Sequence, residues 1–150
     1  MRLREIHVRR VAPASTEAVY RLLIDGPSWT RWSPIESVEL EQEGDPPPEG
    51  VGAIRVLRMG RTRGRDQILE LVPNRTFKYA TLSGLPIRDY IGQVDLEPVA
   101  GGTSIHWHSA FLPKVPGTGW VVQRGIARFL GRCATGLAEY AATSSDASAP

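Results

Sequence analysis

Residues 35–111 alternate between apolar and polar side chains in short segments, most of which are separated by very short connections. The first segment, "IESVELEQE", places Val38 and Leu40 on one face and Glu39, Glu41 and Glu43 on the other, which is typical of a strand. Further strands are predicted at 51–59, 65–72, 75–83, 87–97 and 103–111. The connections "GRTRG", "PN", "SGLP" and "PVAGG" are too short for a parallel crossover, which needs about a dozen residues. The pattern therefore predicts an antiparallel sheet.

Helical periodicity occurs on both sides of this region. After a strand at 4–11, "APASTEAVYRLLIDG" predicts a helix with Ser15 as its N-cap, and "PSWTRWSP" predicts a short helical turn. One long helix follows "LPKVPGTG", with an apolar face made by Val122, Ile126, Phe129, Cys133 and Leu137. The element order predicts an α+β fold: a curved antiparallel sheet of six or seven strands around a long C-terminal helix, with two short helices after the first strand. Because one helix does not cover such a sheet completely, we expect a cavity between them.

Length and composition are those of one globular domain, predicted over residues 1–143, with a small, polar and disordered tail over 144–150. The formal charge of +2 permits an anionic ligand but does not require nucleic acid. Cys133 is the single cysteine, the N-terminal segment has no apolar signal core, and no apolar run reaches the roughly 20 residues of a membrane helix. We therefore expect a cytoplasmic protein without a membrane span.

Four stretches carry a resemblance to a known family: "APASTEAVYRLLIDGPSWTRWSP", "GVGAIR", "SGLPIRDYIGQVDLEPVAGGTSIHW" and the long C-terminal helix. In order and spacing, from about Ile6 to Ala142, they resemble the helix-grip superfamily of START-type and pollen-allergen-like proteins. Within it, the chain is similar to the bacterial polyketide cyclase/dehydrase and lipid-transport branch. The resemblance implies a helix-grip fold with an interior pocket for an apolar or aromatic molecule, but it implies no particular reaction.

The segment "GGTSIHWHSAF" contains two of the three histidines. Alternation places Trp107 and Ser109 on the inward, apolar face and His106 and His108 on the outward face. His7 also points outward, on a first strand that the fold lays beside the last one. An open convex face offers a metal neither a shielded position nor partners that orient its ligands. We interpret the histidines as solvated surface residues and predict neither a metal nor a cofactor.

The candidate ligand-binding residues are the polar and aromatic side chains expected near the cavity: Trp32, Arg55, Phe77, Tyr79, Tyr90, Trp107, Ser109 and Phe129. If Tyr79 and Tyr90 both point inward, they lie on neighbouring strands and their hydroxyls can grip one polar atom of a ligand. Tyrosines packed in the core and bonded to the backbone are the alternative. Arg55 either anchors an anionic ligand group or forms an outward ion pair with Glu39, depending on one residue of register.

The remaining candidates concern the walls of the pocket. Ser109 is interpreted as a small residue that leaves room for ligand, because the histidines lie on the wrong face to activate it. Trp32 and Trp107 are expected to form pocket walls, with core packing as the alternative. Three glycines inside the long helix each cost up to about 1 kcal/mol relative to alanine, which indicates a close approach to the helix or a bend: Gly125, Gly131 and Gly136.

Two functional hypotheses place the chemistry in this pocket. The first is binding of a small hydrophobic or aromatic molecule, lipid or polyketide-like. The second is an enzyme of the polyketide cyclase/aromatase or dehydratase type, with Tyr90, Tyr79 and Arg55 as candidate catalytic residues. An enzyme needs a perturbed acid or base in the cavity, and Asp66 and Glu70 are the nearby carboxylates, with undetermined facing. We therefore rank the binder above the enzyme.

A third hypothesis is an interaction protein that uses the arginine-rich hairpin "RVLRMGRTRGR". The glutamate-rich strand beside it neutralises this charge in the simpler interpretation, and no nucleic-acid-binding motif accompanies it, so nucleic acid is not expected as a partner. Arg124, Arg128 and Arg132 recur at every fourth position of the long helix and predict a solvated face. A contact with an acidic carrier protein or with a second copy of the chain remains open.

Overall fold

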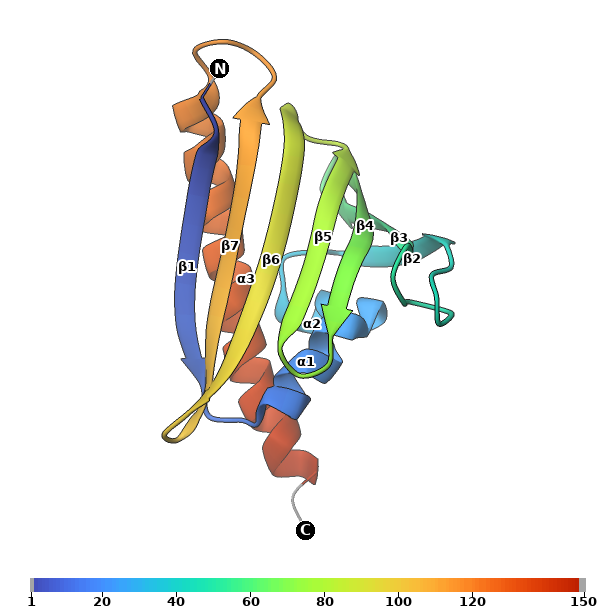
Figure 1. Cartoon of the computed structure of the whole chain (residues 1–150), viewed down its shortest axis with the longest axis vertical. Helices are drawn as coiled ribbons and strands as arrows, with labels where there is room; N and C mark the ends of the chain where they lie inside the picture. The colour runs from blue at the N-terminus through green and yellow to red at the C-terminus, as the bar shows by residue number, and fades with distance from the viewer. Residues whose placement is uncertain (1, 149–150) are drawn as a thin grey trace.

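A seven-stranded antiparallel sheet curves around one long helix in the computed structural model, which describes residues 2–148 and places side chains up to residue 143 (Figure 1). The strands occur in the order β1-β7-β6-β5-β4-β3-β2, so the first strand pairs with the last, as predicted. The elements are β1 (Arg4–Ala12), α1 (Thr16–Ile24), η1 (Gly26–Ser28), α2 (Trp29–Trp32), β2 (Ser37–Gln42), β3 (Ile54–Met59), β4 (Thr62–Val72), β5 (Thr76–Ser83), β6 (Ile87–Val99), β7 (Gly102–Pro113) and α3 (Gly119–Ser148). The predicted α+β helix-grip architecture is therefore confirmed.

The two short helical segments after β1 close one end of the sheet, near α3 (Figure 1). Ser15 caps α1 as predicted, because its hydroxyl accepts a hydrogen bond from the Ala18 backbone N–H at 3.1 Å. The apolar face of α1 is buried, with Val19 and Leu23 fully inaccessible. This packing directs the following segment, η1 and α2, towards the concave side of the sheet.

Strand β7 shows the predicted alternation in full. Ile105, Trp107, Ser109 and Phe111 are buried on the concave side, whereas the residues between them are half-buried on the convex side. Neighbouring β6 contains a bulge at Asp89, whose φ of 52° lies in the left-handed region. The bulge precedes the inward-facing part of β6 that contributes to the core.

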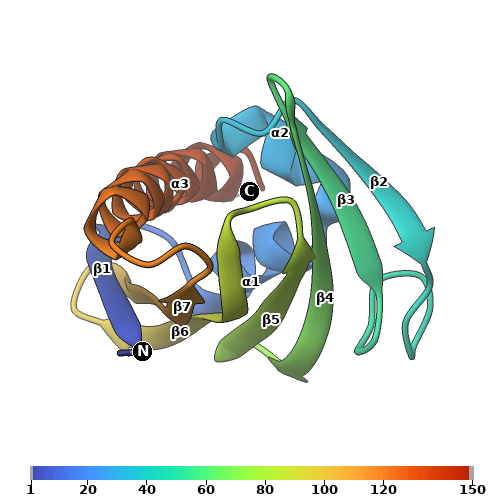
Figure 2. The same ribbon diagram turned by 90° about the horizontal axis from the view of Figure 1, so that it is seen from above.

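Helix α3 covers only part of the concave face. It packs mainly along β1, with its apolar residues Leu130, Cys133, Ala134 and Leu137 buried. Figure 2, seen from above, shows α3 over the β1 and β7 side of the sheet, while β2, β3, β4 and β5 curve away from it. The curvature leaves space between α3 and the middle of the sheet.

A close approach explains one of the three glycines of α3. A Cβ atom on Gly136 would overlap the carbonyl oxygen of Trp32, so glycine is required where α2 crosses the helix. A Cβ on Gly125 would meet nothing within 4 Å, and one on Gly131 would lie 3.5 Å from the flexible end of Arg10. The predicted close approach therefore applies to one glycine of the three.

Helix α3 continues to Ser148, through most of the segment for which the sequence predicts a disordered tail from residue 144. Residues 149–150 of that segment lie outside the described residues. Among the residues that the structure describes, no helix combines the length and the apolar character that crossing a membrane requires.

Candidate functional site

A cavity of about 340 Å³ lies between α3 and the concave face of the sheet. Its walls come from β3, β4, β5, β6 and the turn between β5 and β6, and α3 closes the remaining side. The helix contributes apolar side chains: Val122, Ile126, Phe129 and Leu130. The polar residues of the wall are Thr62, Asp66, Tyr79, Thr81 and Tyr90. A cavity of this size and character is within the range of small-molecule sites.

The facing of β5 and β6 brings the two predicted tyrosines together in the wall. Tyr79 and Tyr90 are both buried, and their ring centroids lie 6.1 Å apart. Tyr79 pairs across the sheet with Gly92, where a Cβ atom would overlap the Tyr79 ring. Gly92 therefore provides the space in which the Tyr79 ring lies flat against β6.

The Tyr79 hydroxyl is already hydrogen-bonded, because it accepts the indole N–H of Trp107 at 3.1 Å. Burial raises the pKa of Tyr79 well above its ordinary range and raises that of Tyr90 to about 12. Both phenols are therefore neutral at physiological pH and act as hydrogen-bond donors or acceptors. The Ser109 hydroxyl makes no hydrogen bond with good geometry, although it lies near enough to Tyr90 to oppose part of that rise in pKa.

Among the described residues that line the cavity, Asp66 is the one carboxylate. Its Oδ1 accepts a hydrogen bond of 2.8 Å from the Thr81 hydroxyl on β5. Burial raises the pKa of Asp66 to about 6, an effect that this hydrogen bond and the charge of Arg55 only partly offset. Asp66 thus changes its charge in the physiological range while it faces the cavity. Glu70, the other carboxylate considered from the sequence, is exposed and lies outside the wall.

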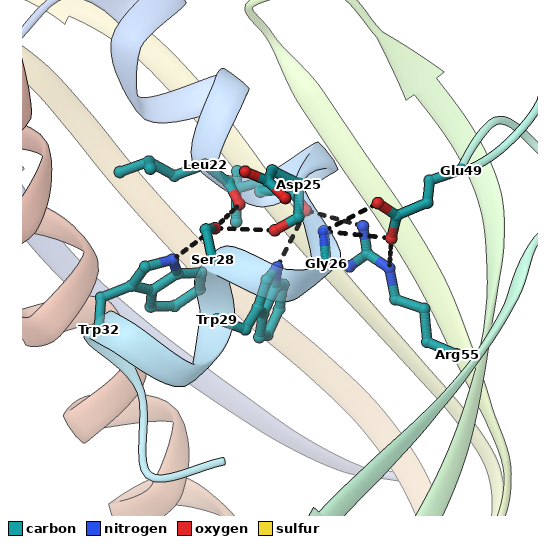
Figure 3. Close-up of polar contacts among 9 residues, drawn as sticks. Leu22, Asp25, Gly26, Ser28, Trp29, Trp32, Glu49 and Arg55 are labelled. Atoms are coloured by element: carbon teal, nitrogen blue, oxygen red, sulfur yellow. Dashed lines mark hydrogen bonds and ion pairs between the residues drawn. The ribbon is translucent and has the colours of Figure 1, made fainter. Parts of the chain in front are cut away.

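Arg55 points inward, but its guanidinium is hydrogen-bonded to other groups of the protein (Figure 3). Its side chain is 4% exposed, and its Nε donates to Glu49 Oε1 at 2.8 Å while a terminal nitrogen donates to the Leu23 carbonyl at 3.1 Å. Both Glu49 oxygens also accept the backbone N–H of Gly26, at 3.1 and 3.0 Å. This network joins the loop after β2 to the α1–η1 turn.

Of the two alternatives for Arg55, the outward ion pair with Glu39 is wrong. Arg55 pairs with Leu40 across β2 and β3, and Glu39 pairs with Val56, one residue away from the predicted register. The "GDPPPEG" loop instead brings Glu49 to the guanidinium. Since side chains alternate between faces, one residue of register decides which partner Arg55 meets.

A second, much smaller cavity of about 10 Å³ lies beside the first. Arg55, Trp29 and Phe77 line it, together with Asp66 and Tyr79, which also belong to the large cavity. Its volume is about that needed for one water molecule. Of the predicted ligand contacts, Arg55 and Phe77 therefore border this small space and not the wall of the large cavity.

The expectation that Trp32 and Trp107 form pocket walls is wrong. Both rings are buried in an aromatic cluster with Trp29, at centroid distances of 4.5 Å for Trp29–Trp32 and 5.6 Å for Trp29–Trp107. The Trp32 indole donates to Ser28 Oγ at 3.1 Å (Figure 3). Ser109 also lies behind the wall, so it does not provide room for ligand as predicted. Core packing, the stated alternative, describes these side chains.

The facing of Asp66 could not be determined from the sequence, and no sequence pattern singled out Thr81. Asp66 lies two residues before the fully buried Ile68 on β4, which is the alternation that places it on the concave face. The alternation of apolar and polar residues was a weak guide here, because β4 pairs irregularly with β5 on either side of these residues. Of the eight predicted ligand residues, Tyr79, Tyr90 and Phe129 lie in the wall of the large cavity.

The arginine-rich hairpin is partly neutralised, as expected. Arg65 on β4 donates two hydrogen bonds to the Glu41 carboxylate on β2, at 2.9 and 2.6 Å, and so spans β3. Arg124, Arg128 and Arg132 are exposed on α3. These charges lie outside the cavity, on the solvated surface of the protein.

The three histidines gather on the convex face. His7 and His106 approach to 3.0 Å between Nδ1 and Nε2, and the His106 and His108 rings stack at 4.5 Å between centroids. His108 Nε2 lies 2.8 Å from Asp95 Oδ2 on β6. Burial, followed by the charges of His108 and Arg9, lowers the pKa of His106. The predicted outward facing is correct, but these histidines contact polar side chains of the protein as well as solvent.

A sheet closed by one long C-terminal helix, with a cavity between them, defines the helix-grip class of proteins. Residues 4–142 match the family described as "Polyketide cyclase / dehydrase and lipid transport", and the chain belongs to this family. A sequence search against curated proteins finds no match.

Solved structures show the same fold at low sequence identity. A START superfamily protein from Mycobacterium smegmatis is similar with a TM-score of 0.80 and 13% identity, over 93% of this chain and 98% of that one. A protein from Thermus thermophilus has a TM-score of 0.76 and 22% identity, over 95% and 99%. Ara h 8.0201 has a TM-score of 0.74 and 16% identity, over 95% and 99%.

Proposed function

We propose that the protein binds one small, mainly apolar molecule in the large cavity and holds a polar group of that molecule with Asp66, Thr81 and Tyr90. The observation that supports this is the cavity itself: about 340 Å³ bordered by apolar side chains of α3 and by a few polar groups on the sheet. Affinity would come from burial of apolar surface, at about 25 cal/mol per Å² before the costs of ordering.

The polar groups of the wall favour a ligand that carries a hydroxyl or amine donor. Thr81 already donates to Asp66, so the remaining acceptor capacity of this carboxylate is directed to other donors. The Tyr90 hydroxyl adds a donor that is not ionised at neutral pH. A ring system with one hydroxyl or amino group satisfies both requirements, whereas a carboxylate would meet the charge of Asp66.

The proposal is tested with an environment-sensitive naphthalene dye as a probe, displaced in turn by flat phenols, aromatic amines and fatty acids, and with calorimetry on the best competitor. We expect phenols or aromatic amines to compete more strongly than fatty acids. Intrinsic tryptophan fluorescence is a poor readout, because Trp32 and Trp107 lie outside the wall.

Two matched helix variants connect binding to this cavity. Gly125 lines the cavity and has open space around its Cβ position, so Gly125→Phe should abolish dye binding. Gly131→Phe places the same ring on the same helix, next to a surface groove instead, and should leave binding unchanged. Equal binding by both variants, with circular dichroism showing both folded, would exclude the cavity as the binding site.

A catalytic role in the same cavity is a second candidate, and the raised pKa of Asp66 favours it. An ionised Asp66 can remove a proton next to a ketone, while Tyr90 stabilises the enolate oxygen. In a β-hydroxy ketone, the enolate then forms the carbon–carbon double bond and expels the hydroxyl group, which takes back the proton held by Asp66 and leaves as water. This is the dehydratase reaction, and attack of the enolate on a second carbonyl of the same chain is the cyclase reaction.

The two candidates differ in turnover. Binding of a phenol without consumption of β-hydroxy ketone substrates supports a carrier or sensor. Turnover that is lost in both Asp66→Asn and Tyr90→Phe, with the dye still bound, supports the enzyme. We also propose a cytoplasmic location. In addition, we propose that the arginine face of α3 contacts an acidic carrier protein or a second copy of the chain. The exposure of Arg124, Arg128 and Arg132 supports such a contact.

A further inference from the structure

The convex face of the sheet brings together all three histidines of the chain and one aspartate, from three neighbouring strands. His7 lies on β1, His106 and His108 on β7, and Asp95 on β6. The register pairs His7 with His108 and Asp95 with His106 directly across the strands. Ligand atoms of Asp95, His106 and His108 all lie within 4.8 Å of one another. Residues far apart in the sequence therefore form one compact polar group.

We infer that Asp95, His106 and His108, with His7 as the fourth ligand, form a binding site for a divalent transition-metal ion such as Zn²⁺. Imidazole nitrogen and one carboxylate are the ligands that Zn²⁺ accepts in a four-coordinate site. Two nitrogens bound at the usual zinc distance in a tetrahedron are roughly 3.3 Å apart. The His7 and His106 nitrogens are 3.0 Å apart, close to this spacing. The ligand atoms of Asp95, His106 and His108 lie within 4.8 Å of one another, and His7 lies outside that set, so the four side chains must draw together around the ion.

An open sheet face was expected to offer a metal neither a shielded position nor partners that orient its ligands, and the structure provides the second of these. Thr76 Oγ1 donates to Asp95 Oδ1 at 3.0 Å, and Gln93 Nε2 donates to both carboxylate oxygens at 2.9 and 3.1 Å. The carboxylate is thereby held towards His108. Hydrogen bonds of this kind fix the orientation of metal ligands and raise affinity.

The charges around the group determine how tightly it is expected to bind a metal ion. Asp95 contributes one negative charge, and the imidazoles must be neutral to bind a metal. Arg9, which pairs with His106 across β1 and β7, carries a positive charge that opposes a cation. We therefore expect binding in the micromolar range, well below the affinity of closed structural zinc sites. Since the ligands come from β1, β6 and β7, the ion would link the N-terminal strand to the middle of the sheet.

The test is a calorimetric titration of Zn²⁺ into the full chain, prepared without a histidine tag and dialysed against a chelator. We expect one ion per chain, with affinity reduced at least tenfold in His106→Ala and in Asp95→Asn. Asp89→Asn is the matched control, because Asp89 lies exposed on the same strand outside the group, and its left-handed backbone suits asparagine. Affinity for Zn²⁺ in this control should equal that of the original chain.

A second readout measures thermal unfolding. Zn²⁺ should raise the unfolding temperature of the original chain and of Asp89→Asn, but not that of His106→Ala, because a ligand that binds the folded state stabilises it. All substituted residues are exposed or half-buried, so the variants should fold. No stoichiometric heat of binding in the original chain, or binding that persists unchanged in His106→Ala, would overturn the inference.

Discussion

Thr81 on β5 donates a hydrogen bond of 2.8 Å to Asp66 on β4, and both residues line the cavity beneath α3. The pair places an ionisable acid against an apolar space, where burial raises its pKa to about 6 from an ordinary value of 3.8. The hydroxyl fixes one oxygen of the acid and leaves the rest of its hydrogen-bonding capacity for a ligand. This relationship is the polar centre of the proposed binding site.

The raised pKa of Asp66 makes stability depend on pH. The unfolded chain releases this proton near pH 4, whereas the folded chain retains it up to about pH 6. The folded state therefore binds more protons in this window. The stability that protonated Asp66 contributes is lost as pH rises, by up to about 3 kcal/mol. We expect the free energy of unfolding of the original chain, relative to Asp66→Asn, to fall between pH 4 and pH 7 in urea titrations.

The control for this prediction is Glu70→Gln, which neutralises an exposed carboxylate on the same strand. Because Glu70 lies outside the cavity wall, this variant controls for the removal of one negative charge from the strand. If the difference in the free energy of unfolding between the original chain and Asp66→Asn stays constant with pH, the buried environment assigned to Asp66 is contradicted.

Tyr79→Phe should destabilise the protein by about 1–3 kcal/mol, because the buried indole N–H of Trp107 loses its acceptor. Chemical unfolding at neutral pH measures the change. Tyr140→Phe is the matched control, since the hydrogen bond that the Tyr140 hydroxyl accepts from Arg31, at 3.3 Å, is exposed. Equal stability of the two variants would mean that the Trp107–Tyr79 contact contributes nothing.

Two glycine substitutions on α3 should change the stability of the protein in opposite directions. Gly136→Ala forces a methyl group into the Trp32 carbonyl and must move α2 or the helix, so we expect a loss of several kcal/mol. Gly125→Ala meets no atom and should stabilise the helix by about 0.5–1 kcal/mol. Thermal unfolding of both variants checks the prediction. A stable Gly136→Ala protein would show that the two helices do not cross this closely.

Arg55→Met should lower stability by about 3 kcal/mol or more, because it leaves the Glu49 carboxylate without its cation in a largely enclosed position. Arg65→Met removes the arginine of the exposed pair with Glu41 and should change stability little. Unfolding titrations of the two variants measure the contrast. If both variants lose the same amount, burial does not distinguish these ion pairs.

The order and type of the elements could be predicted from the sequence because the signals are local. Side chains alternate with a period of two along a strand and recur near 3.6 along a helix, whatever the rest of the chain does. Ser15 as an N-cap and the inward facing of Trp107 and Ser109 follow from these periods and are confirmed. The cavity could be expected too, since one helix is narrower than a curved seven-stranded sheet.

Contacts between distant segments were beyond these local signals. The "GDPPPEG" loop is long enough to allow more than one pairing of β2 with β3, so the partner of Arg55 depended on a register that alternation alone does not determine. The same holds for the histidine group, because His7 reaches His106 only after β1 pairs with β7, and Asp95 reaches His108 only after β7 pairs with β6.

By itself, the sequence determined an antiparallel sheet closed by a C-terminal helix, with polar and aromatic groups turned towards an interior space. The tertiary structure alone decided which of those groups reach the space. Trp32 and Trp107 pack against Trp29 behind the wall, while Asp66 and Thr81 meet within it. The physical reason is that periodicity assigns a side chain to a face, whereas the curvature of the sheet and the course of α3 decide which part of that face is filled.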